Sequence, residues 1–236
     1  MMPEMDLTKD NRERIMRYVL LALTFAALLI SGIACSTPIL KLIPLFNSLF
    51  IMMLQAKANR YAYILGGLNS ILYAVIYVYA GIYVSAASAF FFSFPVQILT
   101  FWFWNKNSYE KSTKFRTMNT KWRILASLAF LIVWGGTLTV LTLIGSDFVL
   151  LDTSVSLLGI AVSILTMLAF KEYAPLWLLS SLLSLVLNIM LTVKDITFFP
   201  YTVSSTYNLI CTSIALYNVY RLYRIQNTAK DEKEII

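Results

Sequence analysis

The chain has 236 residues, 59% of them hydrophobic and 13% charged, with a formal net charge of +7 at pH 7. Soluble domains carry roughly 45–50% apolar and about 25% charged residues, so this composition excludes a soluble domain and predicts an all-α integral membrane protein. Histidine is absent, which removes the commonest general base and the commonest metal ligand. We therefore expect no enzyme, no metal site and no bound cofactor.

Long apolar segments predict about eight transmembrane helices, because about 20 apolar residues cross the hydrocarbon layer. The segments are residues 17–36, 39–56, 61–79, 83–104, 123–144, 152–170, 173–192 and 198–220. They are separated by charged or turn-forming residues, such as Thr37–Pro38, Gly81 and Lys194–Asp195. The first segment is longer than a usual signal-peptide core, so we expect it to remain as a helix.

The basic residues test this count, because loops on the cytoplasmic side of a membrane are rich in Lys and Arg. With a cytoplasmic N-terminus, the eight helices place all but two of the 19 Lys and Arg residues on the inside, and the exceptions are Lys41 and Lys194. We therefore predict a multi-pass protein of the cytoplasmic membrane with both termini in the cytoplasm. Since the positive charge is a signal of topology, we expect no nucleic-acid partner.

A weak internal repeat divides the chain. Lys57-Ala-Asn-Arg-Tyr61-Ala opens one central helix, and Lys171-Glu-Tyr173-Ala opens its counterpart in the second half. Repeats of this kind underlie many transporter folds and predict two three-helix bundles joined by a linking helix, with one extra N-terminal helix. The predicted parts are 1–36 for the N-terminus and extra helix, 37–104 for the first bundle, 105–144 for a basic cytoplasmic loop and the linking helix, 145–222 for the second bundle and 223–236 for a cytoplasmic tail.

Polar and aromatic residues of the central helices are candidates for a binding site, because polar groups at membrane depth usually face a cavity or another helix. Trp177, Ser181 and Ser184 share one face of the seventh segment. Amides and hydroxyls of this kind hydrogen-bond a neutral polar solute while rings stack on its flat part, or else they join helices. The candidate substrate-binding residues are Asn69, Tyr73, Phe91, Gln97, Trp177, Ser181, Ser184, Tyr207 and Asn208.

The helices are also informative through what they lack. No Asp, Glu, Lys or Arg lies in the middle of a predicted helix, whereas proton-coupled carriers commonly place an acidic relay there. No GxxxxGK[ST] loop is present for ATP hydrolysis, and the isolated Cys35 and Cys211 match neither a zinc site nor a disulfide framework. These absences favour facilitated diffusion, although sodium coupling through backbone carbonyls stays open.

Several short motifs follow one another in a characteristic order. They are Lys57-x-x-Arg-Tyr61, Gly67-Leu-Asn69-x-x-Leu-Tyr73, Phe90-Phe-Phe92, Phe101-Trp102-Phe-Trp104, Asp152 at a helix start, Lys171-x-Tyr173, Leu176-Trp177-Leu-Leu and Ala215-Leu. Over roughly residues 40–222, their order and spacing resemble the PnuC family of bacterial vitamin and nucleoside carriers. The resemblance implies a three-plus-one-plus-three helix fold similar to SWEET sugar carriers. It also implies uptake of nicotinamide riboside, thiamine, riboflavin or deoxynucleosides, which a cytoplasmic kinase then traps.

The sequence departs from the pattern of the nicotinamide riboside carriers. Their Gly-Trp-x-x-Trp motif reads Thr100-Phe-Trp102-Phe-Trp104, a family asparagine is replaced by Ser184, and a family tyrosine by Asn208. Changed polar partners imply a changed ligand, because unpaired buried groups reject the wrong one. We expect a nucleoside-like substrate between the bundles, with a 2′-deoxynucleoside at least as well supported as nicotinamide riboside. The alternatives are thiamine or riboflavin uptake, or a non-transporting channel or receptor subunit, and a homo-oligomer in the bilayer is left open.

Overall fold

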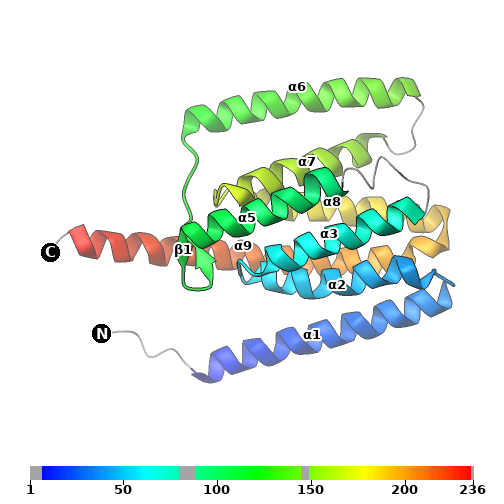
Figure 1. Cartoon of the computed structure of the whole chain (residues 1–236), viewed down its shortest axis with the longest axis horizontal. Coiled ribbons are helices and arrows are strands. Elements are labelled where there is room, and N and C mark those ends of the chain that lie inside the picture. The colour runs from blue at the N-terminus through cyan, green and yellow to red at the C-terminus, as the bar shows by residue number, and fades with distance from the viewer. Residues whose placement is uncertain (1–6, 80–88, 145–148, 235–236) are drawn as a thin grey trace.

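The computed structural model describes residues 7–79, 89–144 and 149–234. Within these ranges the chain forms eight long helices with two short helical turns and one small hairpin (Figure 1). In chain order the elements are α1 (Leu7–Ala34), α2 (Ile39–Ala56), α3 (Ala62–Tyr79), the π-helical turn η1 (Ala89–Ser93), α5 (Phe94–Lys106), β1 (Ser108–Tyr109), β2 (Ser112–Thr113), α6 (Thr120–Ile144), α7 (Val149–Met167), α8 (Tyr173–Lys194), the 3-10 turn η2 (Ile196–Phe198) and α9 (Phe199–Glu234).

Helix length and apolarity agree with a membrane protein. Among the described residues, four helical stretches are long and apolar enough to cross a bilayer, namely Ile15–Ala34, Thr120–Val140, Val149–Met167 and Tyr173–Lys194. Leu42–Ala56 of α2 and Ala62–Val75 of α3 are apolar but shorter, which agrees with the short second and third segments expected from the sequence. The predicted all-α membrane fold is confirmed.

Three predicted boundaries need comment. Helix α1 begins at Leu7, well before the predicted start of the first segment at residue 17. The predicted fourth helix, 83–104, begins outside the described residues, and its described part is η1 followed by α5, which ends at Lys106. The predicted tail, 223–236, continues α9 as a helix up to Glu234. Residues 221–234 contain neither Pro nor Gly and include two Arg, two Lys and two Glu residues, which are residue types that favour helix.

Six helices close into a ring around the centre of the molecule. Neighbour contacts run from α2 to α3, α5, α7, α8 and α9, and then from α9 back to α2. The first bundle is therefore α2, α3 and α5, and the second bundle is α7, α8 and α9. The extra helix α1 packs outside this ring on α2 and α9, and the linking helix α6 lies on the outer side of α7 (Figure 1).

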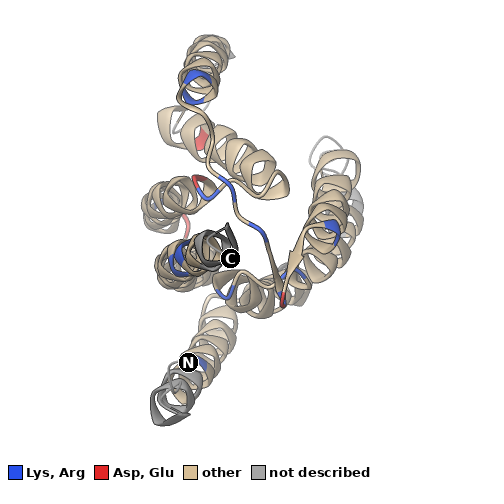
Figure 2. Cartoon of the chain, turned by 90° about the vertical axis from the view of Figure 1, so that its left-hand side faces the viewer, with Lys and Arg blue, Asp and Glu red and all other residues tan. Residues whose placement is uncertain are grey.

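One end of the ring collects most of the cationic residues. Here α1 begins and α9 ends, and here lie the α2–α3 turn, the α5–α6 connection and the α7–α8 turn (Figure 1). Figure 2 views this end of the molecule and shows Lys and Arg residues along the connection that crosses the space between the helices. We call this end of the ring the basic end. The basic loops, which alternate along the sequence with loops poor in Lys and Arg, thus meet at one end of the folded molecule.

The two bundles contain the same turn between their first two helices. The Asn59 N–H donates to the Leu54 carbonyl (3.1 Å), and the Phe170 N–H donates to the Leu165 carbonyl (3.0 Å). Each turn passes through an alanine with positive φ, 48° at Ala58 and 57° at Ala169. This is the Schellman way of ending a helix, and it gives the weak sequence repeat a structural basis.

The structural register of the repeat differs from the register that the sequence suggests. The sequence pairs Tyr61 with Tyr173 as the first aromatic residue of each helix. In the structure Tyr61 is exposed, whereas Tyr63 is buried in the same cluster as Tyr173. With the turns aligned on Ala58 and Ala169, Tyr61 corresponds to Glu172, and Tyr63 is the tyrosine of the first bundle that points inward.

Candidate binding site

A cavity of about 310 Å³ lies inside the ring of six helices. This volume falls at the lower end of the range typical of small-molecule pockets, roughly 300–1,000 Å³. The first bundle lines it with Gln55, Tyr63, Val96, Gln97 and Thr100. The second bundle lines it with Val155, Gly159, Val162, Ser163, Thr166, Tyr173, Trp177, Ser180, Ser181, Ser184 and Asn208. The cavity therefore lies between the bundles, where the sequence predicts substrate to bind.

Helix α8 supplies the most continuous polar face of this cavity. Trp177, Ser181 and Ser184 recur at helical spacing, so all three side chains point to one side. The Asn208 side-chain amide on α9 donates to the Ser181 hydroxyl (3.0 Å). This hydrogen bond orients the amide and leaves its carbonyl oxygen as an acceptor at the cavity wall.

Gln97 faces α8 from the opposite bundle, and glycine makes its position possible. A Cβ atom added to Gly66 on α3 would lie 2.8 Å from the Gln97 side-chain oxygen, closer than real Cβ atoms approach. The same oxygen is buried and has no hydrogen-bond partner. Buried polar atoms are almost always paired, so an unpaired acceptor in a cavity wall is suited to a ligand donor.

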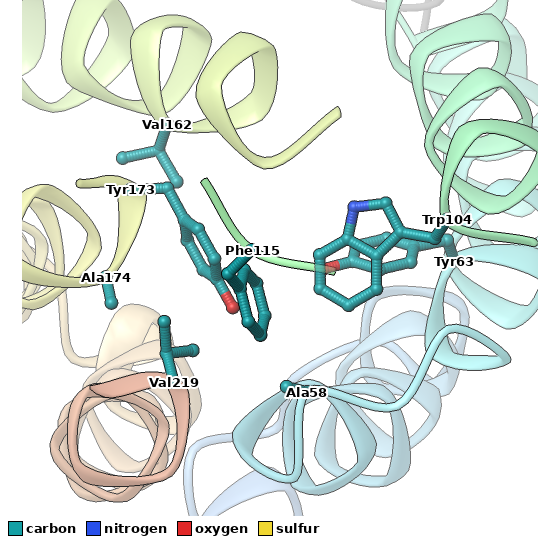
Figure 3. Packing of buried hydrophobic residues seen from close by; sticks show 8 residues of the cluster. All are labelled: Ala58, Tyr63, Trp104, Phe115, Val162, Tyr173, Ala174 and Val219. Atoms are coloured by element: carbon teal, nitrogen blue, oxygen red, sulfur yellow. The ribbon is translucent and has the colours of Figure 1, made fainter. Parts of the chain in front are cut away.

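An aromatic cluster closes the cavity toward the basic end (Figure 3). The Trp104 ring packs edge-on against Tyr63 (centroids 4.8 Å apart) and against Phe115 (5.6 Å). Tyr173 lies 6.3 Å from Phe115 and 6.5 Å from Trp177. Such edge-on and tilted contacts each contribute about 0.5–1.5 kcal/mol beyond the area that they bury. Trp177 thus extends from this cluster into the cavity.

Hydrogen bonding ties this cluster to both bundles. The Trp104 indole N–H on α5 donates to the Thr166 carbonyl on α7 (2.7 Å), and the tryptophan is fully buried. The Tyr173 hydroxyl is also buried but has no hydrogen-bond partner. The cluster therefore combines a fixed contact between the bundles with one buried hydroxyl that has no hydrogen-bond partner among the described residues.

Among the residues that the structure describes, the cavity wall carries no formal charge. None of the residues that line it is Lys, Arg, Asp or Glu. The part of the chain that the structure describes also holds no group of three or more Cys, Asp or Glu side chains able to bind a metal ion. The site can therefore stack flat rings and exchange hydrogen bonds, but it offers no charged partner.

Five of the nine predicted site residues meet at this cavity, namely Gln97, Trp177, Ser181, Ser184 and Asn208. The other four, Asn69, Tyr73, Phe91 and Tyr207, do not line it. The Asn69 amide donates to Ser48 (3.2 Å) and joins α3 to α2. The Phe91 ring is 77% exposed, and Tyr207 is buried among apolar residues of α1 and α2. Tyr207 precedes Asn208, so the helical rotation of about 100° per residue turns it away from the cavity.

The sequence prediction did not include several lining residues. Gln55 and Tyr63 lie beside the basic α2–α3 turn, and Thr100 lies in an aromatic run. Tyr63 and Tyr173 each follow one of the two equivalent turns. The two tyrosines are not equivalent positions of the repeat, because Tyr63 stands five residues after Ala58 and Tyr173 stands four residues after Ala169.

A second hollow, of about 600 Å³, lies between α1, α2 and α3. Apart from Tyr18, Asn47 and Asn69, its wall consists of Leu, Ile, Met and Phe side chains. Leu65, Leu68 and Leu72 among them are exposed on the outer surface of the ring. Although it is larger, this hollow lacks convergent polar groups and faces the region that lipid occupies, so we place the binding site inside the ring.

Comparison with known proteins agrees with this architecture. The sequence model of the family described as nicotinamide mononucleotide transporter matches residues 38–225. None of the curated proteins compared with the chain matches it. A solved structure described as the vitamin B3 transporter PnuC is similar, with a TM-score of 0.72 and 17% identity, covering 89% of this chain and 93% of that one.

The two findings support different statements. At 17% identity the likeness to the solved structure shows a shared fold. The family match extends from the start of the first bundle to just past the end of the predicted second bundle, and it confirms the resemblance seen in the sequence motifs. The chain therefore belongs to the nicotinamide mononucleotide transporter family, whose members carry small molecules across membranes.

Proposed function

We propose that the chain takes up a nucleoside-like solute, a 2′-deoxynucleoside or nicotinamide riboside, across a bacterial cytoplasmic membrane by facilitated diffusion. One observation carries the proposal, which is the uncharged wall of aromatic rings, amides and hydroxyls inside the ring of helices. A nucleoside has the matching parts, because its base is flat and its sugar carries neutral hydroxyl groups. Thiamine and riboflavin remain the alternatives within the same fold.

The uncharged wall favours a nucleoside over its phosphate. A phosphate monoester carries about −1.5 to −2 charges at pH 7. Burial of that charge is costly unless it is paired, and no Lys or Arg lines the cavity. The positively charged ring of nicotinamide riboside differs, because delocalised cations are attracted to the faces of Trp and Tyr rings.

The cavity suggests a role for each group. Trp177 stacks on the base, and the unpaired Gln97 oxygen accepts a hydrogen bond from the ligand. Asn208, Ser181 and Ser184 bond the sugar or the edge of the base from the other bundle. We assign no ligand contact to Asn69, Tyr73, Phe91 or Tyr207, because these residues lie outside the cavity.

Transport follows from the division of the cavity between two bundles. The seams of the ring are the contacts of α2 with α9 and of α5 with α7. Rocking of one bundle against the other at these seams would open the cavity to each side in turn, as in other carriers built from repeats. With the basic end in the cytoplasm, phosphorylation by a cytoplasmic kinase would give a product that the uncharged cavity rejects, and uptake would continue down the gradient.

Thermal stabilisation of the purified protein tests the substrate class. The panel is nicotinamide riboside, its 5′-monophosphate, 2′-deoxynucleosides, ribonucleosides, thiamine and riboflavin. A ligand at a hundredfold excess over its Kd stabilises the folded state by about 2.7 kcal/mol. We expect stabilisation by a nucleoside and none by the monophosphate. Equal stabilisation by the monophosphate would contradict the argument from charge, and stabilisation by none of the panel would contradict the proposal.

Flux into vesicles containing the purified chain tests the mode of transport. A facilitator gives saturable, competable uptake that stops when the internal and external concentrations are equal. Accumulation above that level under an imposed proton or sodium gradient would show ion coupling instead. Flux that does not saturate would favour a channel, and binding without flux would favour a receptor subunit.

A further inference from the structure

The basic end of the cavity is covered by the connection between α5 and α6. This segment, residues 107–119, contains the β1–β2 hairpin and is polar elsewhere except at Phe115 and Met118. Its one phenylalanine, Phe115, points inward and is only 7% exposed. The ring packs against both Trp104 of the first bundle and Tyr173 of the second, whose own ring centroids are 6.5 Å apart (Figure 3). Phe115 therefore packs on the contact between the bundles at this end.

The same segment is hydrogen-bonded to both bundles at equivalent positions. The Arg60 N–H donates to the Lys111 carbonyl (3.0 Å), and the Lys171 N–H donates to the Arg116 carbonyl (3.0 Å). Arg60 and Lys171 each stand two residues after the positive-φ alanine of their turn. Two copies of one turn thus hold one loop, so movement of the bundles apart must break at least one of these attachments.

A third attachment comes from the part of α9 beyond the predicted last transmembrane segment. The Gln226 side-chain oxygen accepts a hydrogen bond from the Phe115 N–H (2.8 Å). Its amide nitrogen donates to the Thr113 carbonyl (2.9 Å). One side chain thus holds the backbone on both sides of Lys114 and fixes the direction in which the Phe115 ring enters the cluster.

We propose that Phe115 is the gate residue of the basic end and that Gln226 is a positioning residue, which holds this gate shut through the backbone of residues 113–115. Substrate passes this end only after the loop withdraws Phe115 from its contacts with Trp104 and Tyr173. The inference rests on the proposed transport function. It specifies the route by which substrate leaves the cavity, and it assigns a role in transport to the part of α9 beyond residue 220, which contains Gln226.

Access of a thiol reagent to the cavity tests the gate without any ligand. The reporter is Ser163→Cys, at the cavity wall, in a chain whose two native cysteines are changed by Cys35→Ala and Cys211→Ala. A charged, membrane-impermeant methanethiosulfonate is applied to right-side-out and to inside-out vesicles. Loss of a buried phenylalanine strongly destabilises the closed arrangement, so we expect Phe115→Ala to speed labelling from the basic side about tenfold or more.

The matched control is Tyr109→Ala, which removes a ring from the same hairpin but outside the buried cluster. The labelling rate of this control should equal that of the parent chain. The labelling rate of Phe115→Ala from the opposite side should also equal that of the parent chain. Phe115→Leu keeps an apolar side chain and should give an intermediate rate, and it serves as the second variant if the alanine variant fails to fold. Equal labelling of the folded Phe115 variants and the control would overturn the gate.

Gln226 is tested by non-additivity. We expect Gln226→Ala to speed labelling in the same direction, and the double variant with Phe115→Ala to be no faster than Phe115→Ala alone, because both changes act on one element. If the rate increases of the two single variants multiply in the double variant, the two residues act independently and the positioning role of Gln226 is overturned. Ligand binding by the parent chain is measured separately, so a failed transport assignment is distinguished from a failed gate.

Discussion

The two bundles repeat one architecture but contribute differently to the cavity. The second bundle lines it with Trp177, with serines of α7 and α8 and with Asn208. The first bundle lines it mainly through Gln97 and its neighbours, and it uses Asn69 to join two helices. Equivalent folds therefore need not place equivalent chemistry at their shared interface. From this difference we expect the second bundle to contribute more to ligand affinity than the first.

The largest effect is expected from the ring that enters the cavity from the second bundle. Stacking on an aromatic side chain contributes about 1–3 kcal/mol per base, so Trp177→Ala should lower ligand affinity roughly 10- to 100-fold. Trp102→Ala is the matched control, because Trp102 is 55% exposed and lies outside the cavity. Titration calorimetry measures both variants. Equal losses in the two would remove Trp177 from the site.

The second prediction compares the two asparagines. Asn208→Ala removes a polar group from the cavity wall and should weaken binding about five- to tenfold, since a hydrogen bond contributes about 1 kcal/mol. Asn69→Ala should leave affinity unchanged and lower the thermal midpoint, because hydrogen bonds between membrane helices contribute about 0.6 kcal/mol on average. Affinity and thermal unfolding are measured on both variants. The reverse assignment would show that the ligand contacts α3 instead of α9.

A smaller effect should follow from Gly66→Ala in the first bundle. The new Cβ would collide with the Gln97 amide, and the flexible side chain would move into the cavity. A change of one methylene group in a binding pocket alters the binding free energy by about 1–3 kcal/mol. Because the Gln97 side chain is flexible, we expect a loss at the low end of this range, which corresponds to about fivefold weaker binding. Gly67→Ala meets Ile98 instead and serves as control. If Gly66→Ala weakens binding equally in a Gln97→Ala background, Gln97 is not the cause.

The smallest effect is expected from pH. The cavity wall has no Asp, Glu, Lys or Arg, and the chain has no histidine. For a ligand that does not itself titrate, affinity should stay constant between about pH 5.5 and 8, where histidine is the usual switch. Binding measured at three pH values checks this. A clear midpoint within that range would point to a charged group that reaches the ligand from outside the cavity.

Parts of the site could be predicted because they depend on local spacing. The face shared by Trp177, Ser181 and Ser184 follows from helical periodicity, and all three residues line the cavity. Phe115 could not be found in this way, because a single phenylalanine in a polar loop has no periodic partner. Tyr207 and Asn208 are both plausible from their chemistry, and only the rotation of α9 decides that Asn208 faces the cavity.

By itself, the sequence determined that this is a helical membrane protein, roughly where its membrane-spanning segments lie, and which loops share one end. Those properties depend on the length of the apolar segments and on the distribution of charged residues, and both can be determined from the sequence alone. Only the tertiary structure decided which amides bond to helices and which face the cavity, because that depends on how far each helix is rotated about its axis. That rotation is set by close contacts between segments distant in sequence, such as Gly66 with Gln97 and Trp104 with Thr166.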